Sequence, residues 1–284
     1  MTGRVVRVTG ADTIAVPDAR VALHRVTTGA SGPIDSTHAA GDGRFAFSFN
    51  ADTGAVYLVS ARWDGIEYFG TPIVPPAGDD SAAVITVYDT SSAAPVRLAA
   101  RHLIVSNVTA DGVRDVVDLF VLDNRGSLTR VSADSTRPTW QVRLSGFAVN
   151  ARPGNSGFAA SAMQFSGPVF GLFAAIPPGE RDVEIDYQIP PDTREFSVPV
   201  DVSAPISNVI SDDRTMRVVG DFVRADTAIG GKEYARWQGR LTAGTPLILR
   251  FSNAAAPKWV VPLLVAIMAA LLLGVTAWAL RRTG

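Results

Sequence analysis

Short runs of alternating apolar and polar residues, separated by turn-forming residues, recur along most of the chain. In RDVEIDYQIP, the residues Val183, Ile185, Tyr187 and Ile189 fall on one side and acidic residues on the other. A period of two is typical of a half-buried β-strand, because successive side chains point to opposite faces of a sheet. Between residues 1 and 90 no helical period of useful length occurs, and strand patterning resumes after residue 95. The pattern therefore predicts an all-β fold.

The N-terminal third carries the same pattern with two turn signals. In RFAFSF, the rings of Phe45, Phe47 and Phe49 share one strand face and predict a wall of the core. The preceding pair Asp42–Gly43 suits the positive φ angles of a tight hairpin, and Asp64–Gly65 repeats the device between two strand-like runs. We therefore interpret these four residues as structural turn residues, with Asp42 shaping the backbone and not transferring protons.

The small polar segment DTSSAAP at 89–95 reads as a linker. It divides the chain into a β-sandwich over residues 1–90, a second β-sandwich over 91–256, and a C-terminal segment over 257–284. The expected architecture is two tandem β-sandwich domains followed by a single transmembrane α-helix.

The transmembrane prediction rests on the uncharged segment Trp259–Leu280. As a helix rising about 1.5 Å per residue, it is long enough to cross a hydrocarbon core of about 30 Å. Trp259 and Trp278 lie near its ends, where amphipathic rings prefer the membrane interface, and Arg281 and Arg282 follow it. The expected partner of this segment is a lipid bilayer.

Orientation follows from the basic residues that flank the span. The arginine pair after it outweighs Lys258 before it, which favours a cytoplasmic C-terminus and extracytoplasmic β domains. The first ten residues, MTGRVVRVTG, lack the apolar region of a secretory signal. The alternative is therefore a tail-anchored protein with its body in the cytosol.

Composition narrows the function classes. The 284 residues include no cysteine, which excludes disulfides and thiolate chemistry, and the formal net charge is −1. Residues 91–257 carry 17 basic and 17 acidic side chains and residues 1–90 are acidic, so no folded segment offers the basic surface that nucleic acid requires. No phosphate-binding loop, dinucleotide fingerprint, metalloprotease helix or nucleophile elbow occurs. We expect no enzyme activity, no cofactor, no metal and no nucleic-acid partner.

One candidate ligand site remains in the sequence. Trp63, Tyr68 and Phe69 flank the Asp64–Gly65 turn, and rings at a hairpin tip can stack on sugars or contact proteins. Strand alternation directs at least one of these rings into the core, which weakens the hypothesis.

The segments VRVTGADTIAVPDARVALHRV, DGRFAFSF and YLVSARWDGIEYFG together resemble a carboxypeptidase regulatory-like domain, one of the transthyretin-like and immunoglobulin-like β-sandwiches. The resemblance covers about the first 90 residues. It implies an accessory, adhesive or spacer module outside the cytoplasm, and it does not imply peptidase activity.

These observations favour a non-enzymatic, membrane-anchored, extracytoplasmic protein. It would serve as a binding, adhesion or scaffold module for a membrane or envelope complex, with a protein partner in the envelope. The alternatives are a carbohydrate-binding module that uses the aromatic residues around Trp63 and, less favoured, an enzyme of unrecognised type.

Overall fold

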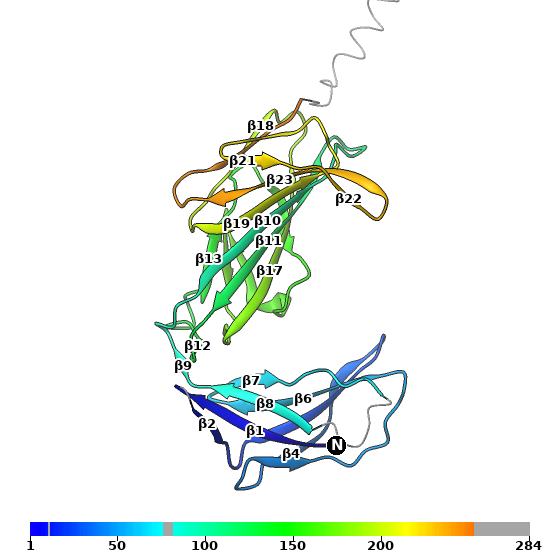
Figure 1. Ribbon diagram of the computed structural model, residues 1–284, viewed down its shortest axis with the longest axis vertical. Coiled ribbons are helices and arrows are strands. Elements are labelled where there is room, and N and C mark those ends of the chain that lie inside the picture. The colour runs from blue at the N-terminus through cyan, green and yellow to red at the C-terminus, as the bar shows by residue number, and fades with distance from the viewer. Residues whose placement is uncertain (11, 76–81, 253–284) are drawn as a thin grey trace, which may run out of the picture.

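The computed structural model describes residues 1–10, 12–75 and 82–252. Its elements in this part are β-strands and one short 3-10 helix, η1 (Ala160–Ala162), which confirms the all-β prediction (Figure 1). The predicted span Trp259–Leu280 and the interface residues Trp259, Trp278, Arg281 and Arg282 lie outside the described residues. Within the described ranges, no helix has the length and apolarity needed to cross a membrane.

The first part of the chain, here called the N-terminal unit (described residues 1–88), consists of two sheets. In one, β1 pairs antiparallel with β2 and β5 and parallel with β8; in the other, the order is β4-β3-β6-β7. The bounds are β1 (Thr2–Thr9), β2 (Asp12–Ala15), β3 (Arg20–Val26), β4 (Ser31–His38), β5 (Arg44–Ala46), β6 (Val56–Trp63), β7 (Ile66–Phe69) and β8 (Ala82–Tyr88).

The core of this unit lies between the two sheets, because residues from both belong to one apolar cluster. Phe45 and Phe47 are buried within it, and Phe49 packs against it, as the alternation predicts. Tyr57 is also buried, and its ring stacks obliquely on Phe49 at a centroid distance of 4.7 Å.

The two predicted hairpins differ in outcome. Asp64 and Gly65 have φ angles of 49° and 79° and join the paired strands β6 and β7, which confirms a two-residue hairpin. At Asp42–Gly43 the tight turn is present, since the Gly43 N–H donates to the Ala40 carbonyl and the Ala40 N–H to the Arg44 carbonyl, both at 2.8 Å, but the flanking strands β4 and β5 belong to different sheets and do not pair. This turn carries the chain across the core from one sheet to the other. Gly43 still has a positive φ of 80°.

The later part, here called the C-terminal unit (residues 97–252), is built on an eight-stranded sheet. Its order is β14-β17-β11-β10-β19-β23-β21, with β22 also paired to β23. The bounds are β10 (Arg97–Val105), β11 (Arg114–Asn124), β14 (Val149–Pro153), β17 (Gly179–Ile189), β19 (Ala204–Ser211), β21 (Phe222–Arg224), β22 (Thr227–Ile229) and β23 (Lys232–Leu241).

Two three-stranded sheets, β13-β16-β15 and β18-β24-β20, contribute to the same apolar cluster as one face of the large sheet. A two-stranded parallel pair, β9 with β12, lies where the units join. The bounds are β9 (Thr90–Ser91), β12 (Thr129–Arg130), β13 (Trp140–Arg143), β15 (Met163–Ser166), β16 (Val169–Leu172), β18 (Glu195–Val198), β20 (Arg217–Val219) and β24 (Leu247–Arg250).

The C-terminal core confirms the predicted alternation of β17 and also contains a charge pair. Val183, Ile185 and Ile189 are 0 % exposed. Beside them, Arg101 donates to both carboxylate oxygens of Asp118, at 2.9 Å and 2.7 Å, and to the Pro199 carbonyl at 2.7 Å. Burial lowers the pKa of Arg101, but the adjacent carboxylate more than offsets this and leaves that pKa above its ordinary value.

Candidate functional site

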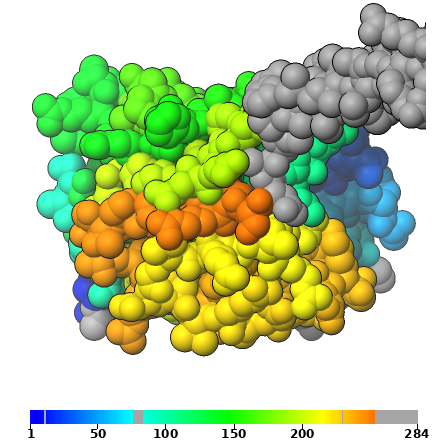
Figure 2. All heavy atoms as spheres, turned by 90° about the horizontal axis from the view of Figure 1, so that it is seen from above, coloured from blue at the N-terminus to red at the C-terminus, as the bar shows by residue number. Residues whose placement is uncertain are grey.

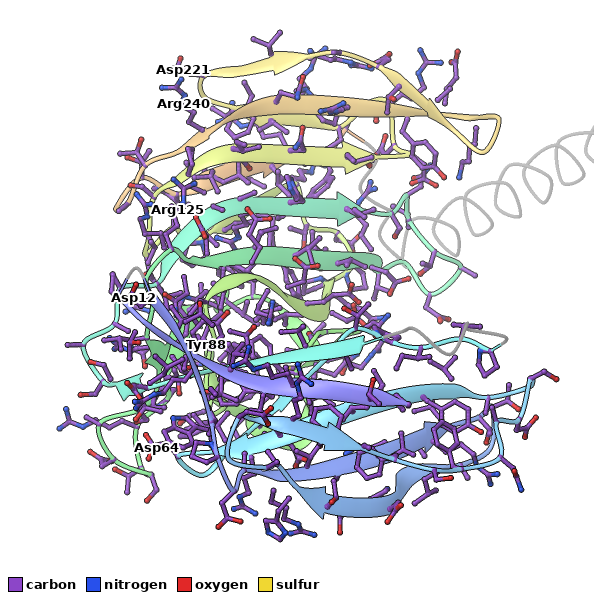
Figure 3. The ribbon with its side chains drawn as sticks, turned by 60° about the horizontal axis from the view of Figure 1, so that its bottom comes forward. Asp12, Asp64, Tyr88, Arg125, Asp221 and Arg240 are labelled. Atoms are coloured by element: carbon purple, nitrogen blue, oxygen red, sulfur yellow. The ribbon has the colours of Figure 1, made fainter. Side chains whose placement is uncertain are left out.

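The best candidate for a binding site is a groove between the two units, with a volume of ≈ 580 Å³. The N-terminal unit supplies β7, the residues that follow it and outward residues of β8, including Tyr88, which Figure 3 labels near the junction. The C-terminal unit supplies Gly157–Ala159, a wall of small and proline residues at 174–178, and Arg181. Two other hollows, of ≈ 800 Å³ and ≈ 650 Å³, each lie within one unit.

A buried hydroxyl joins the units at one end of this groove. The Tyr68 hydroxyl donates to the Tyr88 carbonyl at 3.0 Å and lies 2.8 Å from the Thr129 hydroxyl of the C-terminal unit. Burial raises the pKa of Tyr68, so the phenol stays protonated and available as a donor. The Thr129 N–H also donates to the Asp89 carbonyl at 2.8 Å. These bonds hold the two walls of the groove together.

One wall of the groove presents the edge of a β-sheet. β8 pairs with β1 on one side, and no other strand in the described ranges pairs with it. The Tyr88 carbonyl bonds to Tyr68 and therefore points away from β1. Because alternate residues of a strand direct their backbone groups to the same side, those of Val84 and Thr86 also point away from β1. β8 carries no charged residue, which is unusual for an edge strand.

Two charged side chains of opposite sign line the groove. Arg181 donates to the Glu180 carbonyl at 2.7 Å, and no carboxylate among the described residues lies within ion-pair distance of it. Glu67 on the opposite wall accepts from the Ser60 hydroxyl at 2.5 Å and lies 3.6 Å from the His24 imidazole. Arg181 is therefore the groove's available cation, whereas Glu67 is already bonded.

The structure separates the three predicted aromatic residues. Tyr68 is buried and Phe69 is 56 % exposed, as expected for neighbours on one strand; both line the groove. Trp63 is half-buried, its N–H donates to Asp89 at 3.3 Å, and the Arg7 guanidinium covers its ring at 5.2 Å. These rings do not form one flat exposed surface, so the geometry does not favour sugar stacking around Trp63.

The arrangement nearest to a catalytic one is the contact among Ser60, His24 and Glu67. The Ser60 oxygen lies 2.8 Å from the His24 imidazole nitrogen, but Ser60 is 1 % exposed and also bonds to Glu67. An activated serine needs an accessible oxygen and a base that is oriented by a third group. Ser60 sits instead between the other two side chains. Sequence spacing could not reveal this contact, because the three residues come from three strands.

No metal-binding group was found among the described residues, where no three His, Cys, Asp or Glu side chains gather suitably. His102 bonds to Asn208 at 3.0 Å on the open face of the large sheet. Burial, and then the nearby Arg236, lower the pKa of His102.

The residues that form the second wall of the groove were not predicted. Pro178–Gly179 carries an ordinary turn signal, and Arg181 begins an ordinary alternating strand. Only the packing of the two units brings them opposite β8.

Comparison with known proteins gives no family. No family model and no curated protein matches the chain. Among solved structures, the chain is similar to a "putative protease" from Parabacteroides distasonis, with 8% identity over 55% of this chain and 40% of that one, at a TM-score of 0.34. It is also similar to native leukotriene A4 hydrolase from Saccharomyces cerevisiae, with 11% identity over 64% and 32% of the chains, at a TM-score of 0.35. The chain spans less than half the length of either structure. Likenesses this weak carry no argument about function.

Proposed function

We propose that this chain is a non-enzymatic, membrane-anchored, extracytoplasmic binding protein. In this proposal two tandem β-sandwich domains, the first of the carboxypeptidase regulatory-like kind, are held at a membrane by Trp259–Leu280. They receive an extended segment of an envelope protein in the groove between them. The observation that carries the proposal is the uncharged edge of β8, which no strand in the described ranges pairs with, within a groove lined by both units.

Physical chemistry supports an extended polypeptide as the ligand. An unpaired strand edge offers donors and acceptors at regular spacing, and an added strand satisfies them while its alternate side chains enter flanking pockets. The wall at 174–178 is apolar, and Arg181 provides one cation. The expected ligand is therefore a β-prone segment that carries apolar residues and a carboxylate.

The proposal is tested by placing a photo-crosslinking amino acid at Val84 in the full chain, in cells that make the protein naturally. Val84 is 59 % exposed and lines the groove; Ile34, which is 48 % exposed on β4, is the matched control. We expect a discrete crosslinked protein from position 84 and none from position 34. Equal crosslinking at both positions, or none at position 84, contradicts the proposal.

A backbone variant tests the mode of binding. Thr86→Pro removes an N–H that points away from β1, so it should spare the β1 ladder and abolish the crosslink at Val84. A crosslink that survives Thr86→Pro in a protein with an unchanged melting temperature would show that the edge of β8 does not bind the partner.

A further inference from the structure

The outer face of the eight-stranded sheet is open, and apolar residues surround the hydrogen-bonded pair His102 and Asn208 at its centre. Figure 1 shows this face toward the viewer from β23 to β17, with no other element in front of it. Ile104 is 45 % and Ile206 is 55 % exposed. The outward positions beside them are half-buried apolar residues, namely Val117, Leu119, Val121 and Ile210. Contiguous exposed apolar surface of this kind marks an interaction site.

Charges of opposite sign border this apolar stripe. On the β17 side lie Asp182, Glu184 and Asp186; Asp186 pairs with Arg152, and Glu184 accepts the Asn155 N–H. The β23 side carries Arg236, which donates to the Asn208 amide oxygen at 2.9 Å, and Arg240, beside which Figure 3 labels Asp221. Neither of these two arginines lies within ion-pair distance of a carboxylate in the described part of the chain.

Strand register arranges these residues in rows across the sheet. One row runs Asp186, Val117, Ile104, Ile210, Arg236, so an acid and a base lie at equal distances from a central isoleucine. A second row, beyond that of His102 and Asn208, runs Asp182, Val121, Ala100, Ile206 and then reaches Arg240 of β23, opposite the bulge of β19. Figure 3 labels Arg240 on this margin. Both rows are centred on β10.

We propose that a second copy of this chain binds this face, related by a two-fold axis that runs along β10. Rotation about that axis lays the acidic margin of each copy over the basic margin of the other, and apolar residues over apolar residues. An axis across the strands would instead lay acid over acid. The charge pattern therefore selects the first axis, in which Ile104 lies close to Ile104 of the second copy.

The position of the chain end supports the same axis. Phe251 lies under Arg114 at the start of β11, with 4.4 Å between guanidinium and ring, and the Ser252 hydroxyl donates to the Thr215 carbonyl at 3.2 Å. Phe251 and Ser252 therefore lie at the end of the sheet where β11 begins; Figure 2 views the molecule from above, with the yellow and orange segments of the C-terminal unit toward the viewer. An axis along the strands keeps both chain ends at that end, so two anchors could enter one membrane. This second argument rests on the proposed anchor, whereas the charge argument does not.

The size of the face suggests a weak pair. The face between the two charged margins spans four inter-strand steps of about 4.8 Å and three rows of outward residues, roughly 400 Å² per copy, or about half of the ~800 Å² of a standard interface. Anchoring in one membrane would strengthen the pair by raising the local concentration.

The axis is tested by disulfide crosslinking of the full chain in detergent micelles. Because the chain has no cysteine, Ile104→Cys introduces the only thiol. We expect oxidation to give a covalent dimer with Ile104→Cys and at least tenfold less with Val84→Cys, a control of similar exposure. Absence of the dimer at position 104, or equal yields from the two variants, overturns the proposal.

A charge exchange tests the contact between copies. Asp182→Arg and Arg240→Asp should each raise the dimer dissociation constant at least about fivefold in equilibrium sedimentation, and the double variant should restore it. The two residues lie four strands apart within one chain, about 19 Å, so rescue requires a contact between copies. If both single variants dimerise like the unaltered chain, the face is not the interface and the membrane span alone would account for any dimer.

Discussion

At the scale of single residues, the turn before β5 depends on Gly43 and not on the carboxylate of Asp42. A Cβ at position 43 would lie 2.6 Å from the Val5 carbonyl oxygen, and the positive φ adds backbone strain for any other residue. Asp42 accepts the Arg44 N–H at 3.1 Å, a bond that an asparagine oxygen can also make.

Gly43→Val should therefore destabilise the protein by at least about 1–3 kcal/mol, while Asp42→Asn should change the unfolding free energy by less than about 0.5 kcal/mol. Thermal melts of both variants, made in the chain that ends at Ser252, measure the difference. If Asp42→Asn lost as much stability as Gly43→Val, the carboxylate of Asp42 would itself be required, and the interpretation of Asp42 as a turn residue alone would be wrong.

The buried ion pair of Arg101 and Asp118 makes a second prediction about single residues. Asp118→Asn leaves a guanidinium in the core without its anion, so we expect a loss of about 3–5 kcal/mol in urea unfolding. Replacing both residues with apolar ones, Arg101→Met with Asp118→Leu, should recover most of that stability. If the double variant is no more stable than Asp118→Asn, the charge pair contributes more than its desolvation costs.

At the scale of elements, local alternation was readable from the sequence and strand partnership was not. The inward residues of β17 and the phenylalanines around β5 follow directly from a period of two. The same period cannot show that β4 and β5 belong to different sheets, because pairing depends on contacts distant in sequence. It also gives no sign that Arg101 points inward, since a buried charge requires a partner on another strand.

The groove also could not be predicted from local alternation, because it depends on contacts between residues distant in sequence. Its two walls come from segments about ninety residues apart, and only Tyr68 and Phe69 among the predicted site residues line it. The sequence supplies the uncharged β8 but not its position at a sheet edge.

Substitution of Tyr68 tests whether its hydroxyl couples the stability of the N-terminal unit to that of the C-terminal unit. Tyr68→Phe removes a buried hydroxyl that bonds both units, so we expect a loss of about 1–3 kcal/mol and weaker crosslinking in the groove. Calorimetry of Tyr68→Phe, Thr129→Val and the double variant forms a cycle. Additive losses in that cycle would mean that the hydroxyl pair does not couple the units.

At the scale of the whole molecule, we propose two β units outside a membrane, with a groove for a partner segment between them and an open sheet face for a second copy. The two surfaces are separate: the groove involves β7, β8 and the turn before β17, whereas the open face is centred on β10. A variant such as Ile104→Asp should therefore weaken dimerisation and leave crosslinking at Val84 unchanged.

The central claim, an extracytoplasmic body anchored by Trp259–Leu280, is tested most directly by thiol labelling in intact cells. The absence of native cysteine makes single-cysteine variants unambiguous. A membrane-impermeant reagent should label Ile34→Cys, which replaces a residue 48 % exposed, and should label Thr283→Cys only after the membrane is permeabilised. Labelling of Thr283→Cys but not Ile34→Cys in intact cells would contradict the account and favour a tail anchor with a cytosolic body.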